Sequence, residues 1–496
     1  MRYAMRQAAL LCAVLLARPS FAQTPRALTD ADYARAERFM NYNVNPLVFG
    51  ASVRPTWLAG DRFWYANNIP QGTEFVLVDP ARKTRARAFD QERVASALSR
   101  AADTTYDAFH LPFDAFEFSA DGKSIVFDVG QRRWTCDVAG AACTGAPRPA
   151  ERAGRNEIVS PDGTRAAFIR DDNLWVRDLA TGRETQLTTD GVKDFGYATN
   201  NAGWIRSDRP VLLWSPDSKK IATFQQDERG TGDMYLVETR VGHPVLEAWH
   251  YPLPGDSVIF RIQRVVIDVD AGEVVRLQMP PDQHRSSLCD DVSCGGQWVD
   301  VEWSPDASRL FFLSTSRDHR QEHLREADPN TGAVRDIMQE TVPTFFESGV
   351  GTVNWHALPA SNELIWYSER DNWGHLYLYD LTTGQPKNQI TTGPWDVLQV
   401  LRIDEKARTV YFTGSGREPG DPYFRKLYSV RMDGSHLTLL TPEDADHDVT
   451  LSPSGKYFVD SYSTPQTPPV TVLRDVRGRT VLPLEQADIA KLLAAG

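Results

Sequence analysis

A short turn phrase recurs along this chain of 496 residues, and it constrains the fold more than any other feature. The phrase reads Ser-Pro-Asp-Gly or a close variant, and it begins at Ser119, Ser160, Ser215, Ser304 and Ser452. Proline presets φ at the second position, the Asp or Ser side chain caps the turn backbone, and glycine accepts a positive φ. Apolar, strand-like runs follow the phrases, as at 124–127, 165–169 and 309–313. The repeat therefore predicts short strands joined by tight turns.

A second phrase, Asp-x-x-x-Gly, begins at Asp178, Asp268, Asp328 and Asp380, usually just after a strand-like run, and predicts an outer hairpin in each repeat. From Ser119 to Ser304 the first phrases lie 41, 55 and 89 residues apart, and the last gap is about two units. This period is typical of a four-stranded propeller blade. Without long helical patterns between the strands, a parallel α/β domain is excluded. We predict an all-β propeller over about residues 51–475.

Helical patterns occur only near the two ends of the propeller. Thr29 can cap a helix that runs through 33–40, and 91–100 places Val94, Ala97 and Leu98 on one face. At the other end, 484–495 places Ile489, Leu492 and Leu493 at helical spacing. We therefore expect an N-terminal helical segment over 23–50 and a C-terminal linker helix within 476–496.

The first 22 residues have the pattern of an export signal. Arg2 and Arg6 supply the positive start, 8–17 the apolar run, and 20–22 a small-x-small cleavage site. Cleavage after Ala22 removes three arginines and leaves 51 basic against 66 acidic residues, a net charge of −15. That charge disfavours nucleic acids and anionic membranes as partners, and no later stretch is apolar enough to span a bilayer. We expect a periplasmic or secreted protein.

Four cysteines remain after this cleavage, in two local pairs: Cys136 with Cys143, and Cys289 with Cys294. Export favours disulfides within each pair. The alternatives are free buried thiols or a four-cysteine zinc site, although the spacings are wider than the C-x2-C knuckles of such sites.

Two blocks resemble the N-terminal propeller of the dipeptidyl-peptidase IV branch of the prolyl oligopeptidase family. The first runs from Leu187-Thr188-Thr189-Asp190-Gly191 through Asp194-Phe195-Gly196-Tyr197 to Gln225-Gln226-Asp227-Glu228, and the second from Tyr367 to Asp380. The resemblance implies an eight-bladed propeller that covers an α/β-hydrolase domain. It also implies peptide substrates, a triad carried by the hydrolase, and a homodimer as one arrangement of the intact enzyme.

This sequence departs from that family in two respects. No Gly-x-Ser-x-Gly nucleophile elbow exists in it, since 414–416 is a loop fragment without the spacing. Where family members carry a Glu pair for the amino terminus of the peptide, residues 198–204 offer Asn200 and Asn201 instead. Amides lack the charge-assisted part of such a contact. These two asparagines are the candidate substrate-binding residues, with a solvated turn as the alternative.

One pentapeptide suggests a metal site and is better explained by a strand. The run His319-Arg320-Gln321-Glu322-His323 matches an H-x-x-E-H string, but that motif needs a helix, and the run lies between a strand and a turn. We therefore expect no metal, no other cofactor and no catalytic residue. The sequence predicts the substrate-gating propeller of a serine exopeptidase, inactive without its hydrolase half. The alternative is a free-standing periplasmic propeller that binds a peptide or a protein.

Overall fold

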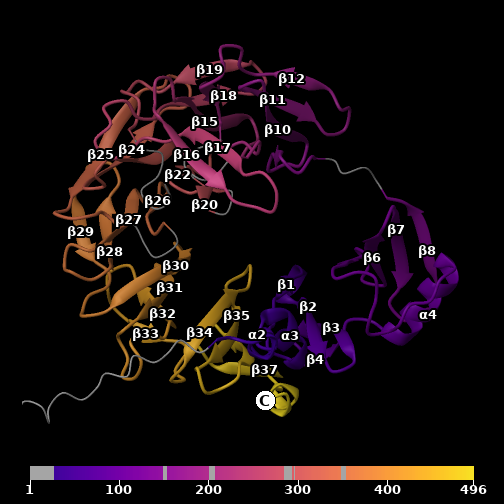
Figure 1. The fold of residues 1–496 in the computed structure, drawn as a ribbon. Helices are drawn as coiled ribbons and strands as arrows, with labels where there is room; N and C mark the ends of the chain where they lie inside the picture. The colour runs from indigo at the N-terminus through magenta and orange to yellow at the C-terminus, as the bar shows by residue number, and fades with distance from the viewer. Residues whose placement is uncertain (1–26, 149–152, 200–206, 284–292, 295–296, 348–352) are drawn as a thin grey trace, which may run out of the picture.

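A computed structural model describes residues 27–148, 153–199, 207–283, 293–294, 297–347 and 353–496. Strands dominate it, and every pair of neighbouring strands is antiparallel, in seven four-stranded sheets, one five-stranded sheet and two short ribbons among the described residues. In each larger sheet the strands follow one another in chain order. Figure 1 shows these sheets arranged one after another around a common centre, with the last beside the first. The all-β prediction is confirmed.

The first three sheets consist of β1 Thr56–Trp57, β2 Phe63–Ile69, β3 Gly72–Asp79 and β4 Thr84–Arg87; β5 Glu117–Phe118, β6 Ser124–Val129, β7 Arg132–Asp137 and β8 Cys143–Pro147; and β9 Ile158–Val159, β10 Arg165–Arg170, β11 Asn173–Asp178 and β12 Glu184–Gln186. The five-stranded sheet consists of β13 Phe195–Tyr197, β14 Leu213–Trp214, β15 Lys220–Asp227, β18 Arg261–Asp268 and β19 Glu273–Arg276. The ribbons are β16 Asp233–Glu238 with β17 Val245–His250, and β20 Ser293–Cys294 with β21 Gln297–Trp298.

The last four sheets consist of β22 Val301–Trp303, β23 Leu310–Thr315, β24 Gln321–Ala327 and β25 Val334–Thr341; β26 His356–Leu358, β27 Glu363–Ser368, β28 His375–Asp380 and β29 Pro386–Gln389; β30 Asp396–Asp404, β31 Thr409–Ser415, β32 Lys426–Arg431 and β33 Thr438–Leu439; and β34 Asp446–Leu451, β35 Tyr457–Ser463, β36 Val470–Asp475 and β37 Thr480–Gln486.

The recurring Ser phrases form the turns between the first and second strands, as the sequence predicts. At Ser304 the hydroxyl donates to Asp306 Oδ1 over 2.6 Å and accepts the Arg309 N–H over 2.9 Å. The Asp-x-x-x-Gly phrases form the turns between the third and fourth strands, as at Asp380 between β28 and β29. Both kinds of turn lie at the same end of each sheet, which we call the phrase end.

The opposite end of each sheet, where the second and third strands are joined, we call the hairpin end. There the backbone that enters the next sheet hydrogen-bonds to the preceding hairpin. Tyr197 donates to the Asp172 carbonyl over 2.8 Å, and Val397 to the Gly374 carbonyl over 2.8 Å. Phe346 donates in the same way to the carbonyl of His319. The connections between sheets therefore gather at the hairpin ends.

The hydrophobic core lies between successive sheets, because each sheet presents apolar side chains to both neighbours. One cluster joins sheets β26–β29 and β30–β33 around Trp395 and Phe412. Another joins the last sheet to the first through Leu473 and Tyr65, and Tyr65 donates to Glu485 over 2.5 Å. Trp214 and Trp355 are buried in two of these clusters, as expected for tryptophans in strands.

Short helices lie near the ends of the chain: α2 Asp30–Glu37, α3 Asn41–Val44, α4 Gln91–Ala102 and α5 Ala490–Ala494, with 3-10 turns η1 Asn45–Leu47 and η2 Ala59–Asp61. Thr29 caps α2 in a capping box with Asp32. The prediction of a helix over 484–495 was wrong in its first part. Residues up to Gln486 pair with β36 as the outermost strand, so only the last turn is helical.

Candidate functional site

The predicted substrate-binding residues Asn200 and Asn201 lie outside the described residues, but their flanks are placed. β13 ends at Tyr197, and the Val211 N–H donates to the Ala198 carbonyl over 2.9 Å. This bond joins the start and the end of the intervening loop, beside the hairpin end of the preceding sheet. Whether the two asparagines meet a substrate stays a prediction.

The carboxyl groups of Asp172, Glu322 and Glu369 have a raised pKa, and each of them lies at a hairpin end. Asp172 lies between β10 and β11, Glu322 begins β24, and Glu369 lies between β27 and β28. Burial raises the pKa of Asp172, and Asp194 and Asp171 raise it further. Equivalent corners of three sheets thus hold carboxyl groups whose neutral form is favoured, although Lys193 partly lowers the pKa of Asp172.

Glu322 is the most buried member of this group, with 0% of its surface exposed. Neither carboxylate oxygen accepts a hydrogen bond of ordinary geometry within the described part of the chain, and the nearby Thr315 hydroxyl lowers the pKa of Glu322 only in part. Burial raises its pKa well above the ordinary value, and Asp300, Asp282 and Glu340 add to the effect. A carboxyl group in such a position is held in its neutral form.

The nearby arginines do not neutralise Glu322, because they are engaged elsewhere. Arg264 donates from Nε to Asp282 over 2.6 Å and from Nη2 to the Leu313 carbonyl over 2.7 Å. Arg325 lies 3.6 Å from the same Asp282 and donates to Asp336 over 2.6 Å. These two arginines therefore stabilise the carboxylate of Asp282 and not that of Glu322.

At the phrase end, buried acids have partners. Glu363 begins β27 and is buried, and both Arg408 and Lys387 form ion pairs with it. Burial alone would raise the pKa of Glu363, but these hydrogen bonds outweigh it and lower the pKa to about 2. The Ser304 and Ser308 hydroxyls likewise lower the pKa of Asp306 to about 2.

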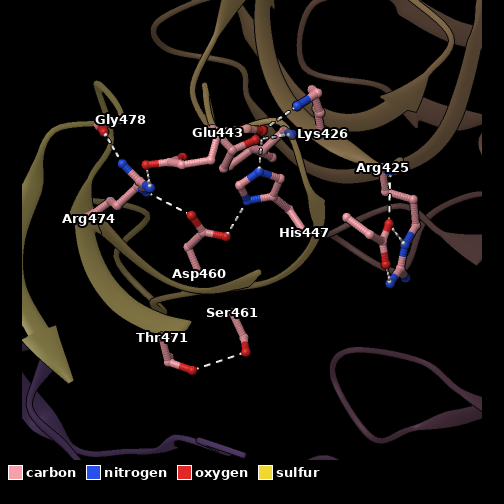
Figure 2. A network of polar contacts seen from close by, with 12 residues as sticks. Arg425, Lys426, Glu443, His447, Asp460, Ser461, Thr471, Arg474 and Gly478 are labelled. Atoms are coloured by element: carbon pink, nitrogen blue, oxygen red, sulfur yellow. Dashed lines mark hydrogen bonds and ion pairs between the residues drawn. The ribbon is translucent and has the colours of Figure 1, made fainter. Parts of the chain in front are cut away.

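A second polar network lies inside the last sheet (Figure 2). Asp460 accepts hydrogen bonds from His447 Nδ1 over 2.8 Å and from Arg474 Nε over 2.7 Å, and Arg474 Nη2 donates to Glu443 over 2.7 Å. Burial would raise the pKa of Glu443, but Arg474 holds it below its ordinary value.

Three ligand atoms of Glu443, His447 and Asp460 lie within 4.8 Å of one another, the spacing of a metal site. The Arg474 guanidinium, however, already binds both carboxylates in the position a cation would take. The arrangement therefore fits a structural ion-pair network better than a metal centre.

The structure also describes one predicted cysteine pair and the H-x-x-E-H string. A disulfide joins Cys136 to Cys143 across β7 and β8, as predicted. Cys289 lies outside the described residues, so its pairing with Cys294 stays a prediction. His319 lies in a turn with φ of 55°, and His323 lies in β24, so the H-x-x-E-H string is a hairpin, as expected.

Sequence reasoning missed Asp172, Glu322 and Glu369 as site residues. Glu369 lies in the second block that resembles the family, and Glu322 lies in the H-x-x-E-H string. A usable signal existed, since each is an acid at the junction of a second and a third strand. That signal becomes visible only when the strands are correctly paired.

Comparison with known proteins identifies the family. The sequence pattern of the dipeptidyl peptidase IV N-terminal region matches residues 119–469. This chain belongs to that family. The dipeptidyl-aminopeptidase B of Aspergillus niger is 23% identical over 459 residues, which cover 83% of this chain and 49% of the relative.

The solved Porphyromonas gingivalis dipeptidyl peptidase 4 shares the fold of this family member, with a TM-score of 0.60 and 20% identity. The match covers 90% of this chain and 61% of that structure. The chain thus spans about half the length of the fungal relative and less than two thirds of the bacterial one. Among the described residues, no helix is long and apolar enough to cross a membrane.

Proposed function

We propose that this chain is the non-catalytic, substrate-gating propeller of a dipeptidyl-peptidase IV-like serine exopeptidase, and that its seven four-stranded sheets and its five-stranded sheet are the eight blades. Contact between the last sheet and the first supports a closed ring. In this proposal the chemistry belongs to an α/β-hydrolase domain, and peptides reach it past the hairpin ends of the blades.

An exposed apolar surface beside the two ends of the described chain carries this proposal. Its members are all highly exposed among the described residues: Leu28, Tyr33 (63%), Phe39 (64%), Met40, Tyr42 and Leu493 (71%). Phe49 pairs with Asp488, and Lys491 lies 4.8 Å from the Phe49 ring, so both ends of the chain meet there. Figure 1 shows α2 and α3 near the C-terminus. A patch of this kind is typical of an interface, and we assign it to the hydrolase domain.

The ribbon β16–β17 supports the homodimer that we also propose for the intact enzyme. It projects from the hairpin end of the five-stranded sheet, and exposed apolar side chains line it: Tyr235, Leu236, Val237, Val241 and Leu246. Two such ribbons can cover each other across a two-fold axis. Sedimentation of a Leu236→Asp, Leu246→Asp variant as a monomer beside a dimeric parent would support this assignment, and two dimers would oppose it.

Recovery of a serine hydrolase together with the tagged chain tests the main proposal. After expression with its leader in a Gram-negative periplasm, where we propose that it resides, the protein would be crosslinked, purified and treated with a fluorophosphonate probe. We expect the pure chain to stay unlabelled and to leave Ala-Pro-p-nitroanilide intact, because it offers no activated serine.

Co-production with a dipeptidyl-peptidase α/β-hydrolase domain should yield a labelled complex that the Phe39→Asp, Tyr42→Asp variant loses. An Arg100→Asp variant, changed on the surface of α4, should keep it. Label on the isolated chain, or no complex with any such domain, would favour the alternative: a free-standing propeller that binds a peptide or a protein.

A further inference from the structure

A cluster of acidic and aromatic side chains lies at the hairpin end of sheet β26–β29, apart from the loop that holds Asn200 and Asn201. Tyr367 is near the end of β27, Glu369 and Trp373 are in the following turn, and Asp396 begins β30. Glu347 comes from the segment after β25. Glu369 is exposed and Trp373 is 37% exposed, so the cluster opens to solvent.

Gly374 lies in contact with both Tyr367 and Asp396. Its N–H donates to Asp396 Oδ1 over 2.7 Å, and its carbonyl accepts the Val397 N–H over 2.8 Å. The Tyr367 hydroxyl lies so close that a Cβ added to Gly374 would be 1.9 Å from it. A side chain at this glycine would fill the position in front of the phenol.

Glu347 is held on the other side of the cluster by its neighbour in the chain. Phe346 is buried and packs against Trp366, with ring centroids 5.7 Å apart, and Trp366 precedes Tyr367 in β27. The carboxylate of Glu347 therefore approaches the same corner of the sheet as Glu369, and the two carboxylates act on each other electrostatically.

Tyr367 points to a missing partner. Only 2% of the residue is exposed, yet its hydroxyl makes no hydrogen bond to any residue of the described chain. Burial raises the pKa of Tyr367, and Glu369, Asp396 and Glu347 raise it further. Burial and the two other carboxylates also raise the pKa of Glu369. A buried phenol beside three acids favours a ligand that is positively charged and can donate hydrogen bonds.

Among the described residues, no basic side chain acts on Tyr367 or Glu369. Arg370, the nearest base in the sequence, donates to Glu340 over 2.8 Å and lies 4.3 Å from the Tyr377 ring, on another side of the strand pair. A chelated metal ion also fits poorly. Of the described side chains, only Glu443, His447 and Asp460 bring three ligand atoms within 4.8 Å.

We propose that Glu369 and Tyr367 bind a primary ammonium group of a peptide in the electrostatic field of the neighbouring carboxylates Asp396 and Glu347, with Trp373 against its alkyl or cationic part. An ammonium group has three N–H donors, which suit separate carboxylate and phenol oxygens better than a compact metal site, and aromatic faces attract such cations. The inference rests on the proposed peptide substrates. The ammonium group belongs either to the amino terminus or to a lysine side chain.

Calorimetry with three peptides of one length tests the assignment: one with a free amino terminus and no lysine, one acetylated with a single lysine, and one acetylated without lysine. We expect the last not to bind. Binding of the first alone identifies the amino terminus, binding of the second alone the lysine, and binding of both a general ammonium site.

The Glu369→Gln variant should weaken the binding of the ammonium-bearing peptide about tenfold, because a charge-assisted hydrogen bond is replaced by a neutral one. Tyr367→Phe should weaken it several-fold. Glu405→Gln, an exposed change at the phrase end beyond the other end of β30, is the matched control and should bind as the parent does. Circular dichroism would confirm that each variant is folded.

Equal affinities of the parent and Glu369→Gln, an equal loss in Glu405→Gln, or equal binding of all three peptides would overturn the assignment. None of these results depends on a hydrolase domain. If no serine hydrolase joins the chain but the ammonium peptide still binds, the proposed exopeptidase role fails and the binding site stands. The reverse pattern removes the site and leaves that role intact.

Discussion

Two buried glutamates in neighbouring sheets show how differently the two ends of the molecule are built. Glu363 lies at the phrase end and is surrounded by Arg408 and Lys387, which lower its pKa to about 2. Glu322 lies at the hairpin end with no hydrogen bond of ordinary geometry in the described chain and a raised pKa. The same side chain is thus stabilised as an anion in one place and held as a neutral acid in the other.

This difference supports the proposal that ligands bind at the hairpin end. Phrase-end turns satisfy their own acids with Ser hydroxyls and cations, which is what a purely structural turn requires. At the hairpin ends some acids are paired, as Asp282 is with Arg264, but Glu322 and Glu369 have a raised pKa, and perturbed pKa values are concentrated at functional sites. If stability were the only requirement, pairing of acids with hydroxyls and cations would be expected at both ends.

Breaking a compensated pair should give the largest effect. Asp460 is fully buried, and Arg474, 3% exposed, donates to it over 2.7 Å. Arg474→Met should lower the free energy of unfolding by about 3–5 kcal/mol, because an unpaired buried carboxylate remains. Urea denaturation would measure it. Arg479→Met, at an exposed pair in the same sheet, should cost less than about 1 kcal/mol, and similar losses in both variants would contradict the account.

Substitution of Glu322 should have a smaller effect on the free energy of unfolding, and this effect should be stabilising at high pH. The pKa of Glu322 is higher in the folded than in the unfolded chain, so the folded state binds more protons between the two values. Its contribution to stability is complete below the ordinary glutamate pKa and is lost as the pH rises toward the raised value. The loss should approach about 1.4 kcal/mol per pH unit over that window.

Glu322→Gln removes this titration, so the variant should match the parent near pH 4 and exceed it in unfolding free energy near pH 8. Glu326→Gln, in the same strand but paired with Arg335 at the phrase end, should not gain stability at the higher pH. Parallel pH profiles for the parent and Glu322→Gln would show that Glu322 has a partner after all.

The sequence predicted the repeated elements well because their signals are local. Pro, Asp and Gly in the Ser phrases determine turn geometry within four residues, and the disulfide Cys136–Cys143 spans a single hairpin. The linker helix was predicted too long because the spacing of Ile489, Leu492 and Leu493 is helical, while pairing of Leu482 and Glu485 with β36 is a tertiary contact. Propensity could not reveal that strand.

The cluster of acidic and aromatic side chains at the hairpin end of sheet β26–β29 could not be predicted from the sequence, for a related reason. Tyr367 and Asp396 come from strands β27 and β30, whereas Glu347 and Glu369 come from two connections, and the packing of Phe346 and Gly374 brings them together. Nothing in the spacing of these residues distinguishes them from the many solvated acids of an anionic protein. Burial and the missing partner of Tyr367 are properties of the folded chain alone.

Carboxyl footprinting tests the central claim, that peptides bind at the hairpin end and that the acids at the phrase end have a structural role. Exposed acids would be labelled with a carbodiimide and glycine ethyl ester, with and without an ammonium-bearing peptide, and quantified by mass spectrometry. The account predicts that the peptide protects Glu369 and leaves Glu405 labelled as before. Protection of Glu405 with Glu369 unchanged would contradict it.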